Sequence, residues 1–305
     1  MSVLVVGSFI TDFIARCSVA PRAGETTIGK AFNTYPGGKG ANQAVACHNM
    51  GSTTYMAGSV GDDLFGKNFI DIFKQFGFDT KYIIKTNEAS TGASLVTVEE
   101  SGQNRIVMTP GANLKYSTKD LDDIEYLFDE ISTCVTQNEQ SIEIVNHLSE
   151  MCKKHNVKMI YNPAPAREIK KEVLDGLFLI TPNETELGLI VGRTLVTDND
   201  YKEAAKELLG KGVLNVVVTL GDRGCLYVSK DEEVLIPSFK VKAIDTVGAG
   251  DCFSGTLAAC IDQGLSIKES LRVANAASAL EVQKNGAIPA IPKREDVFKF
   301  LDERK

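Results

Sequence analysis

Short runs of β-branched and apolar residues alternate along this chain with longer amphipathic stretches, and this alternation constrains its fold most. Strands are predicted at residues 3–6, 53–57, 157–161, 178–181 and 215–220, and helices at residues 42–50, 66–76, 141–155, 201–211, 250–263 and 267–284. Successive parallel strands need a crossover, usually a helix, which covers one face of the sheet. The sequence therefore predicts an α/β protein with a mostly parallel central sheet.

Two segments break this alternation. Residues 26–35 are strand-like, and residues 93–99 and 103–109 predict a hairpin around Ser101 and Gly102. We expect a small antiparallel sheet inserted into the α/β core, where it would serve as a lid. The 305 residues contain no linker, internal repeat or low-complexity tract. One domain over residues 1–305 is predicted, with lid segments at about 14–36 and 90–110.

Composition limits the classes of partner. Lys and Arg total 33 against 40 Asp and Glu, a net charge of −7, whereas proteins that bind a nucleic-acid backbone usually carry the opposite sign. No apolar run approaches the roughly 18 residues that a membrane span needs. The seven scattered cysteines include no CxxC pair, which favours a reducing cytosolic location. Neither nucleic acid nor membrane is an expected partner, and any bound anion must be held locally.

Residues 61–67 (GDDLFGK) match the GxxxxGK part of a phosphate-binding loop. Asn68 follows, where a Ser or Thr hydroxyl should bind Mg²⁺, and Asp62 and Asp63 would repel phosphate. We interpret the segment as a helix start with acidic capping residues. The alternative, a P-loop nucleotidase, would require Lys67 for activity.

Two glycine-rich loops stand directly before predicted helices. The first loop is residues 37–42 (GGKGAN), where Lys39 and Asn42 supply a cation and an amide among small residues. The second is residues 245–251 (DTVGAGD), where small residues directly precede Asp251. Small residues let backbone amides approach an anion, and a helix N-terminus adds about half a positive charge. Asp251 as a simple helix cap is the alternative. Two such loops in one chain favour an anion site.

Asn183 and Glu186 lie three residues apart after the predicted strand at residues 178–181. On one helical face they would hold Mg²⁺ through water, because this ion prefers oxygen ligands and keeps several waters. A capping box at a helix start is the alternative reading of the same spacing.

Together these motifs resemble the PfkB carbohydrate-kinase family, and within it the ribokinases. The N-terminal signature is matched by residues 37–44 with Gly51 and Gly61, and the C-terminal signature by Asp245, Thr246 and residues 248–251. Residues 162–167 (NPAPAR) are typical of ribokinases. The resemblance covers about residues 3–292 and implies a three-layer α/β/α fold with a small inserted β-sheet lid.

The resemblance implies that the γ-phosphoryl group of ATP is transferred to the 5-hydroxyl of ribose. Asp251 would be the general base, and the backbone at Gly248, Ala249, Gly250 and Asp251 would form an anion hole, with Lys39 adding a cation. Family matching assigns the sugar to Ile10, Thr11, Asp12, Gly38, Lys39, Gly40, Ala41, Asn42, Glu139 and Asp251. At Ile10 the sequence departs from the family, which usually carries Asn there, so one hydrogen bond to the sugar is missing.

The resemblance also implies cofactors and an assembly. The nucleotide would lie against Asn183, Thr219, Leu220, Gly221, Asp222, Arg223, Gly224, Gly250 and Asn275. Mg²⁺ would be held by Asn183 and Glu186, mainly through water, and K⁺ by Asp245, Val247, Glu281, Lys284, Gly286 and Ala290, mostly through backbone carbonyls. The apolar lid sheet would form a homodimer.

Two alternatives to a ribose kinase remain at this stage. One keeps the mechanism and changes the acceptor to deoxyribose, fructose, a ketogluconate or a nucleoside. The other is a non-catalytic sensor of sugar or nucleotide on the same fold. Asp251 disfavours the sensor, because a protein that only binds has no need of a base.

Overall fold

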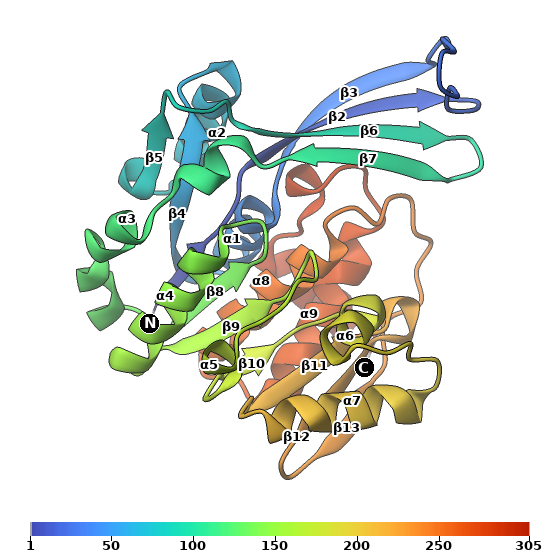
Figure 1. The fold of residues 1–305 in the computed structure, drawn as a ribbon. Helices are drawn as coiled ribbons and strands as arrows, with labels where there is room; N and C mark the ends of the chain where they lie inside the picture. Colours follow the sequence, from blue (N-terminus) through green and yellow to red (C-terminus); the bar gives the residue numbers. More distant parts are fainter. Residues whose placement is uncertain (1, 305) are drawn as a thin grey trace.

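Nine strands form the central sheet in the computed structural model, which describes residues 2–304 (Figure 1). Their order across the sheet is β13 (Glu233–Ile236), β12 (Cys225–Ser229), β11 (Asn215–Thr219), β10 (Leu179–Ile180), β9 (Lys158–Asn162), β8 (Thr133–Gln137), β1 (Ser2–Val6), β4 (Thr53–Gly61) and β5 (Ile83–Thr86). The strands from β11 to β5 pair in parallel, and β12 and β13 add antiparallel strands at one edge. The predicted mostly parallel sheet is confirmed.

Helices cover both faces of this sheet and bury two separate apolar cores. One face carries α1 (Lys39–Asn49), α2 (Leu64–Gln75), α8 (Ala249–Asp262), α9 (Ile267–Glu281) and α10 (Arg294–Asp302); the other carries α3 (Thr118–Asp122), α4 (Ile142–Lys154), α5 (Lys171–Leu174), α6 (Glu184–Val191) and α7 (Asp198–Gly210). Alternate residues of β1 enter opposite cores, Val3 and Val5 on one side and Leu4 and Val6 on the other. Burial on both faces explains why these strands are continuously apolar.

Short 3₁₀ turns join several of these elements. They are η1 (Thr80–Tyr82), η2 (Gly111–Lys115), η3 (Glu125–Asp129), η4 (Gly221–Arg223) and η5 (Ile288–Ala290). Of the helices within residues 2–304, none has both the length and the apolar character needed to cross a membrane.

A second sheet of four strands projects from the central one (Figure 1). Its order is β3 (Ala31–Gly37), β2 (Ile10–Cys17), β6 (Gly92–Glu99) and β7 (Asn104–Thr109). The predicted inserted sheet and its hairpin are confirmed, but the sheet is mixed, because β2 pairs with β6 in parallel. The strand expected at residues 26–35 begins later, at Ala31, which pairs with Arg16 next to the end of β2.

The segment 61–67 is a helix start and not a phosphate loop. Asp63 caps α2 by accepting a hydrogen bond from the Gly66 amide at 2.8 Å. The same carboxylate accepts from the amide and the hydroxyl of Thr91, at 2.8 and 2.7 Å. Its negative charge therefore stabilises the start of α2 and fixes the chain at the entry to β6.

Candidate active site

Polar side chains gather at the edge of the central sheet where its parallel strands end. Ser8 follows β1, Glu139 follows β8, Asn162 ends β9, and Asn183 follows β10. The carboxyl ends of parallel strands share one edge, which is where open α/β sheets bind their ligands. Residues far apart in the sequence are thereby brought to one site.

Asp251, in the first turn of α8, is the centre of this site. Its side chain is 6% exposed, and its two oxygens accept hydrogen bonds from Asn42 Nδ2 and Gln43 Nε2, both at 2.9 Å. Gln43 Oε1 in turn accepts from Gln137 Nε2 at 2.7 Å. The two glycine-rich loops therefore meet, and the Asp251 carboxylate is held in a fixed orientation by amides.

Gln43 and Gln137 were not among the residues singled out from the sequence. Gln43 belongs to the matched signature at residues 37–44 and stands next to Asn42, so adjacency was the only signal. Gln137 is the last residue of β8, and its role follows from the tertiary structure alone.

Gly38 gives the backbone the shape that places Lys39 and Asn42. Its φ of +92° is rarely adopted by residues with a side chain, and a Cβ there would lie 2.6 Å from the Ile10 amide nitrogen. The chain can thus leave β3 and start α1 directly against β2. Ala41 N donates to Ser8 O at 3.0 Å and holds the first turn of α1 in place.

Lys39 lies among carboxylates. Glu139 Oε2 accepts hydrogen bonds from the Lys39 backbone amide at 3.0 Å and from the Ser8 hydroxyl. Burial alone would lower the pKa of the Lys39 ammonium, but the charges of Asp251, Glu139 and neighbouring acids outweigh it and raise that pKa. Burial also raises the pKa of Glu139, although the nearby Lys39 charge opposes this. Lys39 therefore stays cationic in the site.

The second sheet contributes Asp12, which accepts a hydrogen bond from the Ser94 hydroxyl. Burial, helped by the charges of Glu139 and Asp251, raises the pKa of Asp12 to about 6. Ile10 is two residues earlier on β2 and so shares the face of Asp12, whereas Thr11 is buried on the opposite face. Ile10 is 3% exposed, so an apolar side chain is buried two residues from the Asp12 carboxylate.

A pocket of about 400 Å³ lies beside the start of α8 and contains most of the residues predicted for the nucleotide. It is lined by Asn183, Glu184, Thr185, Thr219, Gly221, Gly224, Ser238, Ala249, Gly250, Phe253, Asn275 and Ser278. Three predicted residues do not line it: Leu220 belongs to the apolar core, Arg223 forms ion pairs with Glu184 and Asp198, and Asp222 lies outside the lining. Ser238, Phe253 and Ser278 had no motif to mark them.

Asn183 and Glu186 form the capping box of α6. Asn183 Oδ1 accepts from the Glu186 amide at 2.8 Å, and Glu186 Oε2 accepts from the Asn183 amide at 2.9 Å. Burial raises the pKa of the Glu186 carboxyl above its ordinary value. The hydrogen bond from the Asn183 amide and the charge of Lys39 oppose this shift without cancelling it. Both side chains are at the site, but each already holds a backbone amide.

The residues expected around K⁺ come from two loops that contact each other. Asp245 accepts hydrogen bonds from the amides of Gly286 and Val247, both at 3.1 Å. Glu281 is fully buried, and burial with the charges of Asp245 and Asp251 raises its pKa to about 9. The Lys284 side chain is exposed, and Ala290 ends η5. Within residues 2–304, no three His, Cys, Asp or Glu side chains are grouped so that they could bind a metal ion.

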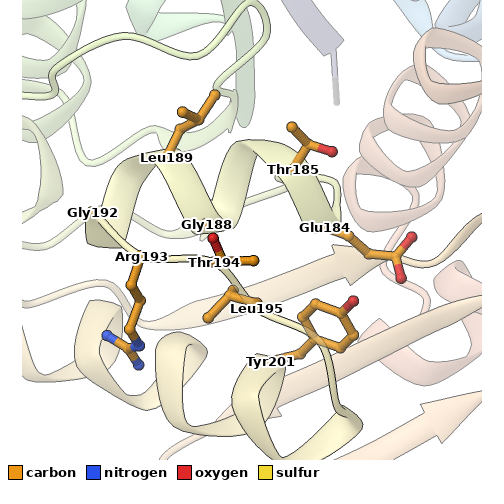
Figure 2. A pocket seen from close by; sticks show the side chains of 9 residues that line it. All are labelled: Glu184, Thr185, Gly188, Leu189, Gly192, Arg193, Thr194, Leu195 and Tyr201. Atoms are coloured by element: carbon orange, nitrogen blue, oxygen red, sulfur yellow. The ribbon is translucent and has the colours of Figure 1, made fainter.

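A larger pocket of about 690 Å³ is lined by α6, the loop that follows it and the start of α7 (Figure 2). It shares Glu184 and Thr185 with the smaller pocket and extends to Leu189, Arg193 and Tyr201. Neither Asp251 nor Lys39 lines it. They do not line the smaller pocket either, but that pocket includes Ala249 and Gly250, which directly precede Asp251 on α8, so we take it as the site.

Comparisons with known proteins agree on the family to which this chain belongs. A family model described as pfkB family carbohydrate kinase matches residues 1–294. The deoxyribokinase of Salmonella typhi is 35% identical over 302 residues, covering 99% of both chains, and the ribokinase of Bacillus subtilis is 35% identical over 304 residues, covering 98% of this chain and 99% of that protein. The structure of Arabidopsis thaliana ribokinase complexed with ribose and ATP matches with a TM-score of 0.91 at 32% identity, over 98% of each chain. The resemblance drawn from the motifs is confirmed.

Replacing Asp12 with Asn should stabilise the unliganded protein by about 1–2 kcal/mol at pH 8. The pKa of Asp12 is about 6 in the folded protein against an ordinary 3.8, so the folded state resists ionisation of this group. The free energy of unfolding of the wild type should fall relative to that of Asp12→Asn as the pH rises from about 4 to about 7. Below about pH 4 the two proteins should have the same free energy of unfolding. Urea unfolding over this pH series measures the difference. Asp71→Asn, an exposed position on α2, is the control, and a difference for Asp12→Asn that does not change with pH would contradict the account.

Proposed function

Because the chain belongs to the pfkB family of carbohydrate kinases, we propose that it transfers the γ-phosphoryl group of ATP to the 5-hydroxyl of a pentose, with D-ribose as acceptor. The observation that carries this proposal is the Asp251 carboxylate, buried at the start of α8 and oriented by Asn42 and Gln43. It lies between the carboxylates of the sugar side and the nucleotide pocket.

On the sugar side, Asp251 accepts the proton of the attacking hydroxyl as the new bond to phosphorus forms. Asn42 Oδ1 is buried and has no hydrogen-bond partner within residues 2–304, so it is an acceptor available to a sugar hydroxyl. Asp12 and Glu139 supply further acceptors. Each sugar hydroxyl both donates and accepts, and this set of carboxylates and amides suits that need.

On the nucleotide side, the first turn of α8 receives the transferred group. The Ala249 amide donates to Thr246 O at 3.3 Å, whereas the Gly250 and Asp251 amides have no intrahelical acceptor at this position. These two amides and the helix dipole stabilise the negative charge on the phosphoryl group, and Lys39 adds a cation. The backbone at Gly248 shapes the turn.

Two metal ions accompany this proposal. Asn183 and Glu186 suit Mg²⁺ bound through water, because each side chain already holds the other's backbone amide. When bound, Mg²⁺ neutralises phosphate charge. The loops at residues 245–247 and 281–290 would hold K⁺, and a buried carboxyl without a hydrogen-bond partner at Glu281 fits a cation there.

A second acceptor, 2-deoxy-D-ribose, is favoured by Ile10. This side chain can neither donate nor accept, so a hydroxyl against it would lose water without gaining a hydrogen bond, at a cost of about 1–3 kcal/mol. A sugar that lacks this hydroxyl avoids the cost. The proposal places C2 of the sugar against Ile10; the identity is 35% both to the Salmonella deoxyribokinase and to the Bacillus ribokinase, so Ile10 alone carries it.

The second sheet is proposed to cover the site and to pair with a second copy of the chain. Phe32, Leu95 and Val107 share the face opposite Asp12 and are 64%, 62% and 66% exposed. An exposed apolar sheet face of this kind is an aggregation hazard unless it is covered. A homodimer through this sheet would bury it.

We place the enzyme in the cytosol. All seven cysteines are free and buried, which suits a compartment where thiols stay reduced.

Replacing Asp251 with Asn should lower kcat by about 10²–10⁴-fold, because the general base is lost. The fold should persist, since the Asn42 amide can turn its unpartnered Oδ1 toward the new amide. Release of ADP with a pentose acceptor measures kcat, and calorimetry checks that sugar and ATP still bind. Asp262→Asn, at the other end of α8 and roughly 16 Å away, is the control. Near-normal turnover in Asp251→Asn would refute the mechanism, and no turnover in the wild type would favour the sensor.

Replacing Ile10 with Asn should raise kcat/KM for ribose relative to 2-deoxyribose by about 10-fold or more, because the new amide can hydrogen-bond the 2-hydroxyl. Both sugars are assayed with ATP and Mg²⁺ for the wild type and the variant. Ile10→Val, which stays apolar, is the matched control and should leave the ratio unchanged. An unchanged ratio in Ile10→Asn would show that Ile10 does not face C2.

Replacing Val107 with Asp should convert the dimer into a monomer, because it places a charge on the apolar face. Sedimentation velocity at micromolar concentrations measures the assembly state. Lys119→Asp, on α3 and away from the second sheet, is the control and should remain dimeric. A wild type that sediments as a monomer at these concentrations would remove the dimer proposal.

A further inference from the structure

Glu139 stands in the short loop between β8 and α4, and the protein holds only one of its carboxyl oxygens. Oε2 accepts hydrogen bonds from the Lys39 amide at 3.0 Å and from the Ser8 hydroxyl. No hydrogen bond from residues 2–304 reaches Oε1, which is the oxygen left for a sugar hydroxyl. The direction of Oε1 depends on the backbone of Glu139, so the contacts that fix this backbone decide how the sugar is bound.

The Glu139 carboxylate is subject to repulsion from neighbouring acids. Asp12 and Asp251 carry the same charge and act on it within the site, while Lys39 attracts it. Like charges repel strongly in a buried site, because little solvent screens them. Contacts outside the carboxylate are therefore needed to keep the loop in one place.

Asn138 binds this loop to β9 and to the segment after it. Its backbone amide donates to Ala164 O at 2.9 Å, and its side-chain Nδ2 donates to Pro165 O at 3.0 Å. Its Oδ1 accepts a hydrogen bond from the Tyr161 hydroxyl. Asn138 is 5% exposed. A buried, fully partnered side chain holds one arrangement, because a shift would leave a polar group without a partner.

Arg167 holds the loop on the other side of Glu139. Its Nη1 donates to Gln140 O at 2.8 Å. The residues directly before and directly after Glu139 are therefore both bound to one segment, residues 161–167. The backbone of Glu139 is fixed from both sides.

Tyr161 lies on the far face of the sheet from the reacting groups. It is 1% exposed and packs in the core on the face that carries α4, whereas α8 with Asp251 covers the opposite face. Its hydroxyl is thus kept away from the bound sugar. Any effect of this hydroxyl on the sugar must pass through Asn138 to Glu139.

We propose that Asn138, Tyr161 and Arg167 are positioning residues that hold the Glu139 carboxylate in the orientation that binds the sugar. This inference rests on the proposed function in that Glu139 accepts a hydrogen bond from a sugar hydroxyl. It goes further by assigning a role in sugar binding to three residues placed outside the sugar site. Because Glu139 also binds the Lys39 amide, the same contacts fix the start of α1.

Replacing Tyr161 with Phe removes one hydroxyl and leaves the ring in place. The Kd for D-ribose and 2-deoxy-D-ribose, measured by calorimetry without nucleotide, should rise by about 3–10-fold, because Asn138 loses one of its hydrogen bonds. The kcat and the KM for ATP should stay within about two-fold of the wild type, since the catalytic groups are untouched. A variant with a lower Tm and a wild-type Kd for both sugars would overturn the proposal, because its role would then be in stability alone.

Tyr227→Phe is the matched control. Tyr227 is also buried, and its hydroxyl donates to another Asn side chain, Asn215 Oδ1, at 2.8 Å. Asn215 starts β11, at the end of that strand away from the site. Tyr227→Phe should lower the Tm as Tyr161→Phe does, but it should leave the Kd for both sugars unchanged. The same rise in Kd in both variants would refute a role specific to Tyr161.

A double-mutant cycle tests whether Tyr161 acts through Glu139. In a Glu139→Ala background, Tyr161→Phe should change the Kd by less than about two-fold, because there is no carboxylate left to position. An undiminished effect of Tyr161→Phe in that background would show that the hydroxyl acts by another route, and the proposal would fall.

Two variants of Arg167 test the other side of the loop. Arg167→Met cannot donate to the Gln140 carbonyl and should raise the Kd for the sugar. Arg167→Lys keeps a donor and should restore most of the affinity. Equal affinity in the Met and Lys variants would contradict the role of Arg167.

Turnover by the same preparations separates this proposal from the proposed function. A wild type that binds a pentose but phosphorylates none loses the kinase assignment, and the Kd values still decide the role of Tyr161. A wild type that phosphorylates a pentose, with a Kd insensitive to Tyr161→Phe, keeps the assignment and loses the positioning role. A wild type that binds no pentose overturns this inference together with the pentose acceptor.

Discussion

The pair of hydrogen bonds that Asn42 and Gln43 donate to the Asp251 carboxylate determines the geometry of the site. Asn42 and Asp251 are 209 residues apart along the chain, and only close packing of α1 on α8 brings them together. Small residues make this packing possible: a Cβ on Gly255 would lie 2.4 Å from Gln43 O. Cys47 Sγ then donates to Gly255 O at 3.1 Å. The Asp251 carboxylate, the proposed general base, is thus oriented by a helix–helix contact in the core.

The net negative charge of the molecule is compatible with anion binding at this site. A chain with a net charge of −7 can bind a nucleotide because the positive field is local: the start of α8, and the Lys39 ammonium held among carboxylates. The acids of the site come from separate elements, Asp12 from the second sheet and Glu139 from the end of β8. Burial, with the charges of Glu139 and Asp251 as smaller causes, raises the pKa of Asp12, which is a cost in stability that the unliganded protein carries for function.

Much of the fold was predictable from local sequence, because strands buried on both faces must be continuously apolar and the helices between them amphipathic. The parallel pairing of β2 with β6 was not predicted, since strand register depends on contacts between distant segments. Motif membership located Asp251, Asn42 and Lys39, but it could not say which way each neighbour points. Thr11 and Leu220 belong to matched segments, yet both side chains turn away from the site.

The residues that escaped prediction share one physical property. Gln43 and Gln137 act through hydrogen bonds between elements, and Ser238 and Phe253 form a pocket wall that exists only after the chain has folded. Nothing in the local periodicity of a sequence marks such contacts. Glu281 was named from the family resemblance, but its burial was not predictable, because an acid in a helical pattern is normally solvent-exposed and here it is fully buried.

A crystal structure of the protein with a pentose and a non-hydrolysable ATP analogue is the most direct test of this account. The account predicts that the 5-hydroxyl of the sugar lies within hydrogen-bond distance of the Asp251 carboxylate, and that the γ-phosphoryl group lies against the Gly250 and Asp251 amides. A sugar hydroxyl bound away from Asp251, or a triphosphate in the larger pocket beside α6, would contradict it.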